Sequence, residues 1–178
     1  MFEVKGGRDD FYVINTRRIG GKPDYDCSRF TESEICENNR KEYSELSLAL
    51  RHTIQKDRVD LGFLAASESD ESFSKGRDYF AFRVRSNNPQ SKIGFLATKT
   101  NSNFFNESAD VYSLDIENTA VKNTQISGYL LNSRKNDSTG HGIRFDVKYI
   151  PNDRYEKTLG FHYFDKDLDL NDMGYLQR

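Results

Sequence analysis

The sequence predicts an all-β fold, an antiparallel up-and-down meander of about nine strands that forms part or all of a β-barrel. Three observations lead to this prediction. Apolar and polar residues alternate with a period of two through most of the chain, which is the pattern of strands with one apolar face. The alternating segments are about nine or ten residues long, near the length of a tilted strand that crosses a bilayer. No segment has a strong helical pattern.

Composition supports one domain built from one-faced strands. The 178 residues match a single domain, with a first strand and cysteine-bearing loop (1–42) followed by a hairpin series (43–178). The chain is 35% hydrophobic and 30% charged, with a mean hydropathy of -0.81, which is polar for a compact soluble domain. Its 13% aromatic content and net charge of -2 argue against disorder. With 26 basic and 28 acidic residues, no global basic field favours nucleic acid as a partner.

The first part of the chain combines a strand pattern with a polar loop. FYVINTRRIG (11–20) reads as a strand ended by Gly20 and Gly21, and TESEICENNRKEY predicts at most a helical turn. Cys27 and Cys36 either close a small disulfide loop outside the cytosol or are two unrelated thiols, and two cysteines do not decide between these. The start MFEVKGGRDDF lacks the apolar core of a signal peptide. An exported protein is therefore expected to carry this chain as an internal piece of a longer precursor.

The hairpin series contains eight further strand patterns. They are YSELSLALRHTI (43–54), RVDLGFLAA (58–66), DYFAFRVRS (78–86), SKIGFLATK (91–99), ADVYSLDIE (109–117), TQISGYLLNS (124–133), and the two strands of HGIRFDVKYIPNDRYEKTLGFHYF (141–164). In the third, Phe80, Phe82 and Val84 oppose Arg83 and Arg85. IGFLA and YLL are apolar on both sides for a few residues, as in a soluble core strand.

The last hairpin shows the alternation most clearly. One face carries mainly apolar side chains, namely Ile143, Phe145, Val147, Leu159 and Phe161, and the other carries Arg144, Asp146, Lys148 and His162. In a membrane barrel the first set would face lipid and the second a wet lumen. Lys157 interrupts the apolar face close to the turn, and its ammonium group would have to reach the membrane interface.

The connections are predicted to alternate in length. QKD, NNPQ and PNDR are short, NTAVKN is intermediate, and SESDESFSKGR, TNSNFFNES, NSRKNDSTG and DKDLDLNDMG are longer. Outer-membrane barrels have tight turns on one side and long loops on the other, but soluble up-and-down barrels can share this feature. Aromatic residues near both ends of the last hairpin, Tyr149 and Tyr155 beside the turn and Phe161 and Tyr163 farther away, match interfacial girdles. The residues thus leave open a soluble all-β ligand-binding module, periplasmic or secreted, in which the Phe80, Phe82 and Val84 face would be covered.

No residue pattern identifies a catalytic or metal site. His52, His141 and His162 lie far apart in the sequence, without partners at metal-binding spacing. DKDLDLND (165–172) has alternate aspartates, but Leu170 and Leu176 stand where an EF-hand loop needs Gly and Glu, so a solvated acidic loop is expected. We expect a non-enzymatic protein without a cofactor. Arg83 and Arg85, with Asp60 and Asp115 expected nearby, would form either a salt-bridged lumen wall or an ordinary solvated sheet face.

Several motifs resemble a known family. FYVINTRRIGG resembles an F-Y-x-R-R-I-G strand with a longer insert before Arg17, and LGFLAAS resembles I-G-L-L-x-A. FRVRSNNPQSKIGFLAT, YSLD and SGYLLNS resemble three further strands, with Ser113 replacing a glycine. The closing GFHYFDKDLDLNDMGYLQR resembles G-Y/F followed by D-D-F-N-P-D-x-G-F-L-x-R, without the proline. These motifs are similar to those of the uncharacterised β-barrel domain that follows a carbohydrate-binding family 9-like module in Gram-negative outer-membrane proteins.

The resemblance implies a location and a fold more than a reaction. It implies an outer-membrane β-barrel, of which this chain would be a fragment, with membrane lipid as a partner and an association with glycans. The lumen-facing or ligand-facing residues would be Arg83, Arg85, Arg144, Asp146, Lys148 and His162.

Overall fold

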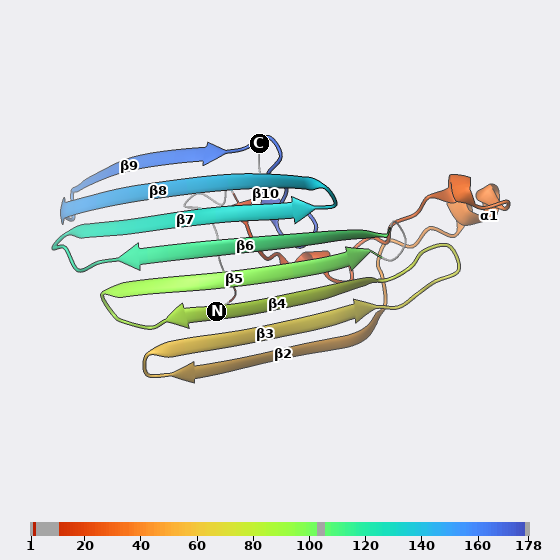
Figure 1. Cartoon of the computed structure of the whole chain (residues 1–178), viewed down its shortest axis with the longest axis horizontal. Helices are drawn as coiled ribbons and strands as arrows, with labels where there is room; N and C mark the ends of the chain where they lie inside the picture. Colours follow the sequence, from red (N-terminus) through yellow and green to blue (C-terminus); the bar gives the residue numbers. More distant parts are fainter. Residues whose placement is uncertain (1, 3–10, 103–105, 177–178) are drawn as a thin grey trace.

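The computed structural model describes residue 2, residues 11–102 and residues 106–176, without the side chains of residues 175 and 176. Its main feature is one antiparallel eight-stranded sheet in which each strand pairs with its neighbours in chain order (Figure 1). The strands are β2 (Leu46–Lys56), β3 (Val59–Glu68), β4 (Arg77–Ser86), β5 (Ser91–Ser102), β6 (Glu107–Asn118), β7 (Thr124–Lys135), β8 (Ser138–Asn152) and β9 (Tyr155–Phe164). The predicted all-β antiparallel meander is confirmed.

The sheet is open. Strands β2 and β9 form its two edges, and neither pairs with the other or with any further described strand. The described residues therefore do not close into a barrel, and the prediction that this chain could form the whole of one is wrong. Closure of these eight strands would require pairing between β2 and β9, and the described strands show no such pairing (Figure 1).

The first predicted strand is mostly not a strand. Only β1 (Phe11–Tyr12) forms a strand, and it pairs with β10 (Tyr175–Leu176) in a separate two-stranded sheet. The Asn15 side chain accepts a hydrogen bond from the Arg17 backbone N–H at 3.2 Å and starts the 3₁₀ turn η1 (Thr16–Arg18). This capping competes with the extended conformation, which is why the meander has eight strands and not about nine.

The predicted alternation of short and long connections is wrong in the second half of the chain. The connection between β3 and β4 is long (69–76), but only residues 136 and 137 separate β7 from β8. Asn136 has φ = 52°, and asparagine tolerates the left-handed conformation that such tight turns need. Between β5 and β6, residues 103–105 of the predicted loop lie outside the described residues. Polar residues extend these strands because ladder hydrogen bonds require the backbone and not apolar side chains.

Two segments from the ends of the chain lie across one face of the sheet, which we call the inner face (Figure 1). They are residues 11–21 and 165–176, and together we call them the cover. Buried cover residues, namely Phe11, Val13, Ile14, Leu168, Leu170 and Met173, form one cluster with buried sheet residues Leu64, Ala66, Tyr79, Ala81, Leu96, Val111 and Leu131. The hydrophobic core of the protein is therefore the space between the cover and the sheet.

The cover explains two features of the sequence. IGFLA and YLL are apolar on both sides because Leu96 and Leu131 lie beneath the cover. The expectation of a solvated acidic loop at 165–172 is wrong in part, since Leu168 and Leu170 are fully buried. Their alternation with polar residues lets this segment bury its leucines against the sheet, while Asp169 and Asp172 lie near Lys135 of β7.

The cysteine-bearing loop extends away from the sheet (Figure 1). Cys27, in the 3₁₀ turn η2 (Cys27–Arg29), forms a disulfide with Cys36, in the predicted helical turn α1 (Ser33–Asn38). The Lys41 ammonium contacts the Glu71 carboxylate at 3.0 Å and connects the loop to the β3–β4 connection. The hydrogen bond to Glu71 raises the pKa of Lys41, against an opposing effect of desolvation.

Among the helices of the described residues, none has the length and apolar character of a membrane span.

Candidate functional site

A polar pocket of about 310 Å³ lies where the cover meets the end of the sheet that carries the β3–β4 connection. Strands β4 to β7 contribute most of its lining through Arg77, Thr100, Ser102, Glu107, Ser108, Ala109 and Lys135. The first cover segment and the loop after it contribute Arg18 and Asp24, and the second cover segment contributes Asn171 and Asp172. The pocket therefore exists only because residues distant in the sequence meet at this edge.

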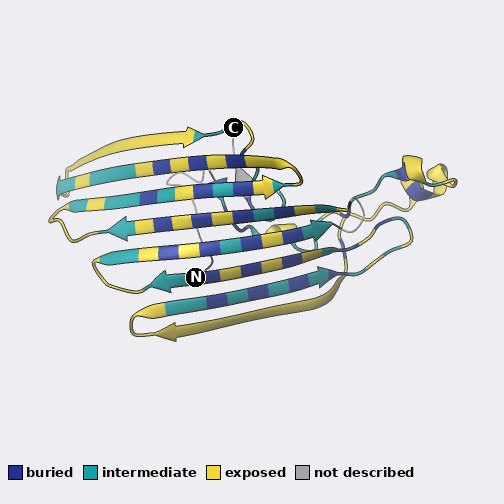
Figure 2. Ribbon diagram, viewed as in Figure 1, coloured by how far each residue is buried: buried dark blue, intermediate teal, exposed yellow. Residues whose placement is uncertain are grey.

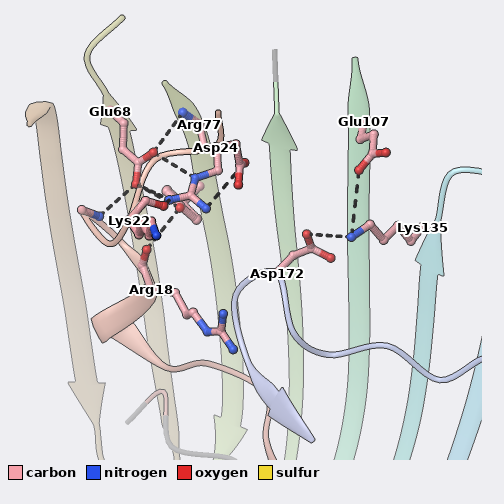
Figure 3. Close-up of polar contacts among 10 residues, drawn as sticks. Arg18, Lys22, Asp24, Glu68, Arg77, Glu107, Lys135 and Asp172 are labelled. Carbon is pink, nitrogen blue, oxygen red and sulfur yellow. Dashed lines mark hydrogen bonds and ion pairs between the residues drawn. The ribbon is translucent and has the colours of Figure 1, made fainter. Parts of the chain in front are cut away.

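Glu68 organises one side of the pocket (Figure 3). Its side chain is only 1% exposed and accepts hydrogen bonds from the Gly20 backbone N–H at 3.0 Å, the Tyr79 hydroxyl at 3.1 Å and the Arg77 Nε at 3.0 Å. The same arginine donates to the Lys22 carbonyl oxygen at 3.1 Å. These charge-assisted bonds hold the chain after η1 against β3 and β4, and so they place Arg18 at the pocket.

Lys135 organises the opposite side (Figure 3). Its ammonium group lies 3.1 Å from the Asp172 carboxylate and 4.0 Å from the Glu107 carboxylate. Three residues before Asp172, the Asp169 backbone N–H donates to the Ser133 hydroxyl of β7 at 2.9 Å. The second cover segment is thus fixed to β7 by polar contacts on the pocket side and by buried leucines beneath.

The pocket keeps unused hydrogen-bonding groups. Among the described residues, the Arg18 guanidinium has no ion-pair partner, and the buried Ser102 hydroxyl has no hydrogen-bond partner. Three cations and three carboxylates line the space, so its formal charges balance and it presents donors and acceptors together. Such a lining suits a small polar ligand with several hydroxyl groups, and its volume lies at the lower end of ligand pockets. No group of three metal-ligating side chains occurs in the described part of the chain.

The six predicted lumen or ligand residues lie outside this pocket. Arg83 and Asp115 form a bidentate pair at 2.8 and 2.9 Å, and their side chains are only 1% and 7% exposed. Gly94 lies between them, where a Cβ atom would come within 2.6 Å of the Arg83 Nη2. Arg85 pairs with the half-exposed Glu117 at 2.9 Å.

The other three charged residues of the prediction form pairs farther along the inner face. The Arg144 Nε lies 2.7 Å from the Asp146 carboxylate, and the Lys148 ammonium lies 2.7 Å from Glu156. The His162 ring stacks on Phe164 at 5.7 Å. The structure thus places the six residues on one face, where five of them form ion pairs and His162 stacks on an aromatic ring. Of the two aspartates expected near the arginines, Asp115 forms an ion pair with Arg83.

Sequence reasoning missed the residues that build the pocket. Glu68, Arg77 and Lys135 end or begin strands, where charged residues are ordinary, so the sequence offered no signal for their contacts. Asp172 lay in the acidic segment that was expected to be solvated. The alternating leucines of that segment were the one usable signal that it packs against something.

The opposite face of the sheet, which we call the outer face, carries large exposed apolar side chains. Buried and exposed residues alternate along β4 to β8 (Figure 2). The exposed set includes Phe80, Phe82, Phe95, Tyr112, Leu114, Leu130, Ile143, Phe145, Leu159, Phe161 and Tyr163.

Comparison of the chain with family models, curated proteins and solved structures gives no match.

Proposed function

We propose that this sheet is part of the wall of an outer-membrane β-barrel, with its outer face toward lipid and its inner face toward the lumen. The protein is non-enzymatic in this proposal and is associated with the binding or uptake of glycans. The observation that carries the proposal is the distribution of polarity between the two faces of the sheet.

The outer face is largely apolar and exposed, which is unusual for a sheet in a soluble protein. Phe80 is 43% exposed and Phe82 is 39% exposed on the outer face, where no described segment covers them. On the covered face, small or polar residues such as Ala81, Thr98 and Ser113 alternate with apolar residues that pack against the cover. Soluble proteins rarely leave so large a contiguous apolar surface in water, whereas alternation of apolar and polar faces is the rule in membrane barrels.

The two edges of the sheet support the same proposal. In β9, Leu159, Phe161 and Tyr163 are exposed, and in β2, Leu48 and Leu50 are exposed. Both edge strands have unpaired backbone groups along one side, because each pairs with one neighbour among the described strands. Open edges cannot stand in the hydrocarbon region of a bilayer, so the proposed barrel includes further strands that pair with β2 and β9.

Location and ligand have separate support. A disulfide between Cys27 and Cys36 favours an oxidising compartment such as the periplasm or cell surface. The sequence motifs given above support the Gram-negative outer membrane. The paired donors and acceptors of the polar pocket, with its balanced charge, support a neutral ligand rich in hydroxyl groups, which is the chemistry of a saccharide.

Tryptophan fluorescence tests the orientation of the sheet, because the chain contains no tryptophan. Phe82→Trp places a single probe on the outer face, and Tyr129→Trp places a matched probe on the inner face, where the Tyr129 ring contacts Phe11. In vesicles with brominated acyl chains, we expect strong quenching of the first probe and little quenching of the second.

Equal quenching of the two probes would contradict the proposal. So would a wild-type protein that is monodisperse and stable in plain buffer without detergent. That second result would favour a soluble ligand-binding module whose outer face is covered by another protein layer.

A further inference from the structure

We infer that the cover is a fixed plug, which keeps the interior of the barrel closed to ions and small solutes. The inference rests on the proposed barrel, and it adds that the lumen is not an open channel. It follows from three properties of the cover, namely its span across the sheet, its fit to the sheet and its burial.

The cover crosses the inner face from one side to the other. At the β3 side, the Gly20 backbone N–H donates to Glu68 at 3.0 Å. At the β8 side, the Asp165 backbone N–H donates to the His141 carbonyl oxygen at 2.9 Å. Between these points, the Phe11 ring contacts the Tyr129 ring of β7 at 5.5 Å. The cover is therefore held against the inner face at points that range from β3 to β8.

The sheet is shaped to receive the cover. Added Cβ atoms at Gly140 and Gly142 of β8 would meet Leu168, overlapping its backbone nitrogen at Gly140 and lying 2.9 Å from its Cδ2 at Gly142. Glycine in a strand often marks a place where another backbone approaches closely. The position of the second cover segment is therefore built into β8.

The two halves of the cover also hold each other. The Asn15 backbone N–H donates to the Met173 carbonyl oxygen at 2.7 Å, and a Cβ atom at Gly174 would overlap the Tyr12 carbonyl oxygen. Phe11, Val13, Leu168 and Leu170 are fully buried. Release of either segment would expose this apolar cluster to water, so the closed arrangement is the stable one.

Conductance and methionine oxidation together test the plug. Met173 is 1% exposed and is, apart from Met1, the only methionine in the sequence, so its sulfoxide reports whether the cover is seated. We expect the intact wild-type barrel, which includes the strands that pair with β2 and β9, to show no conductance steps in planar lipid bilayers and slow oxidation of Met173 in peroxide. Gly140→Ala should open a stable conductance and speed Met173 oxidation at least about tenfold.

Gly128→Ala is the matched control. Gly128 lies on the outer face, where a Cβ atom would be 3.0 Å from the flexible Ile116 side chain, so this variant should behave as wild type. Glu68→Ala releases the opposite end of the cover and replaces Gly140→Ala if that variant fails to fold. It should likewise open a conductance and expose Met173.

The plug would be overturned if the wild-type protein conducted ions while Met173 stayed protected from oxidation. It would also be overturned if Met173 of a variant were oxidised rapidly and that variant still showed no conductance. A Gly140→Ala variant that keeps Met173 protected would contradict the fit of β8 to the cover. Failure of the proposed barrel looks different, because the Phe82→Trp probe would then show no lipid quenching in the wild-type background.

Discussion

At the scale of single residues, the inner face depends on a buried ion pair. The Arg83 guanidinium donates two hydrogen bonds to the Asp115 carboxylate, and both side chains are almost inaccessible to water. Removing one partner would leave the other charge buried and uncompensated. We expect Arg83→Ala to lower the free energy of unfolding by about 3–5 kcal/mol, as measured by denaturant titration of the protein in lipid or detergent.

Arg85→Ala provides the control for this prediction. Its partner Glu117 is half exposed, so the loss should stay below about 1 kcal/mol. The paired replacement Arg83→Met with Asp115→Leu should recover most of the stability, since no isolated charge remains. If Arg83→Ala and Arg85→Ala lowered the free energy of unfolding by similar amounts, burial would not be what makes the loss of the Arg83–Asp115 pair costly.

At the scale of elements, the disulfide loop is separate from the sheet. The Cα atoms of Cys27 and Cys36 are 5.6 Å apart, and the loop extends away from the strands (Figure 1). Replacing both cysteines with serine should speed proteolysis within residues 22–42 by several-fold and leave the sheet's denaturation midpoint nearly unchanged. Limited proteolysis with mass spectrometry measures the first effect, and circular dichroism during denaturation measures the second.

In the absence of reductant, the folded wild-type chain should not react with a thiol reagent, because both cysteines are in the disulfide. Reaction of two thiols per chain in the folded state would contradict the disulfide. A large fall in the midpoint for the double variant would instead show that the loop stabilises the strands.

The elements differ in how well sequence predicts them. Strands β3 to β9 follow from local alternation, as Phe80 and Phe82 opposite Arg83 illustrate, and their predicted bounds differ from the observed ones by a few residues. The segment 11–18 looked equally strand-like, yet the Asn15 cap and the packing of Val13 under the sheet override its alternation. Residues 134–140 looked like a loop because they are polar, although their backbone pairs continue the ladder.

At the scale of the whole molecule, the outer face should respond to charge as a lipid-facing surface does. Phe82 lies near the middle of β4, so Phe82→Arg should destabilise the membrane-inserted protein by about 2–4 kcal/mol. The measurement is reversible unfolding from vesicles in denaturant, with the inserted fraction followed by flotation.

Ser127→Arg is the matched control on the inner face. Ser127 lies opposite Glu117 and Asp146 in the sheet register, which offer carboxylates to a new arginine, so little change is expected. If Phe82→Arg is as harmless as Ser127→Arg, the outer face does not contact lipid.

Local alternation is enough to predict the strands of the eight-stranded sheet and which of their residues share a face, because the alternation of side chains along a strand is a local property of the backbone. The sequence also contained both members of each ion pair and both cysteines. Three features required the folded structure: the sheet stays open, Leu168 and Leu170 pack over its inner face, and the pocket forms where Glu68, Arg77, Lys135 and Asp172 come together. Those outcomes depend on contacts between residues far apart in the chain, and no short-range pattern specifies which distant partner a side chain will meet.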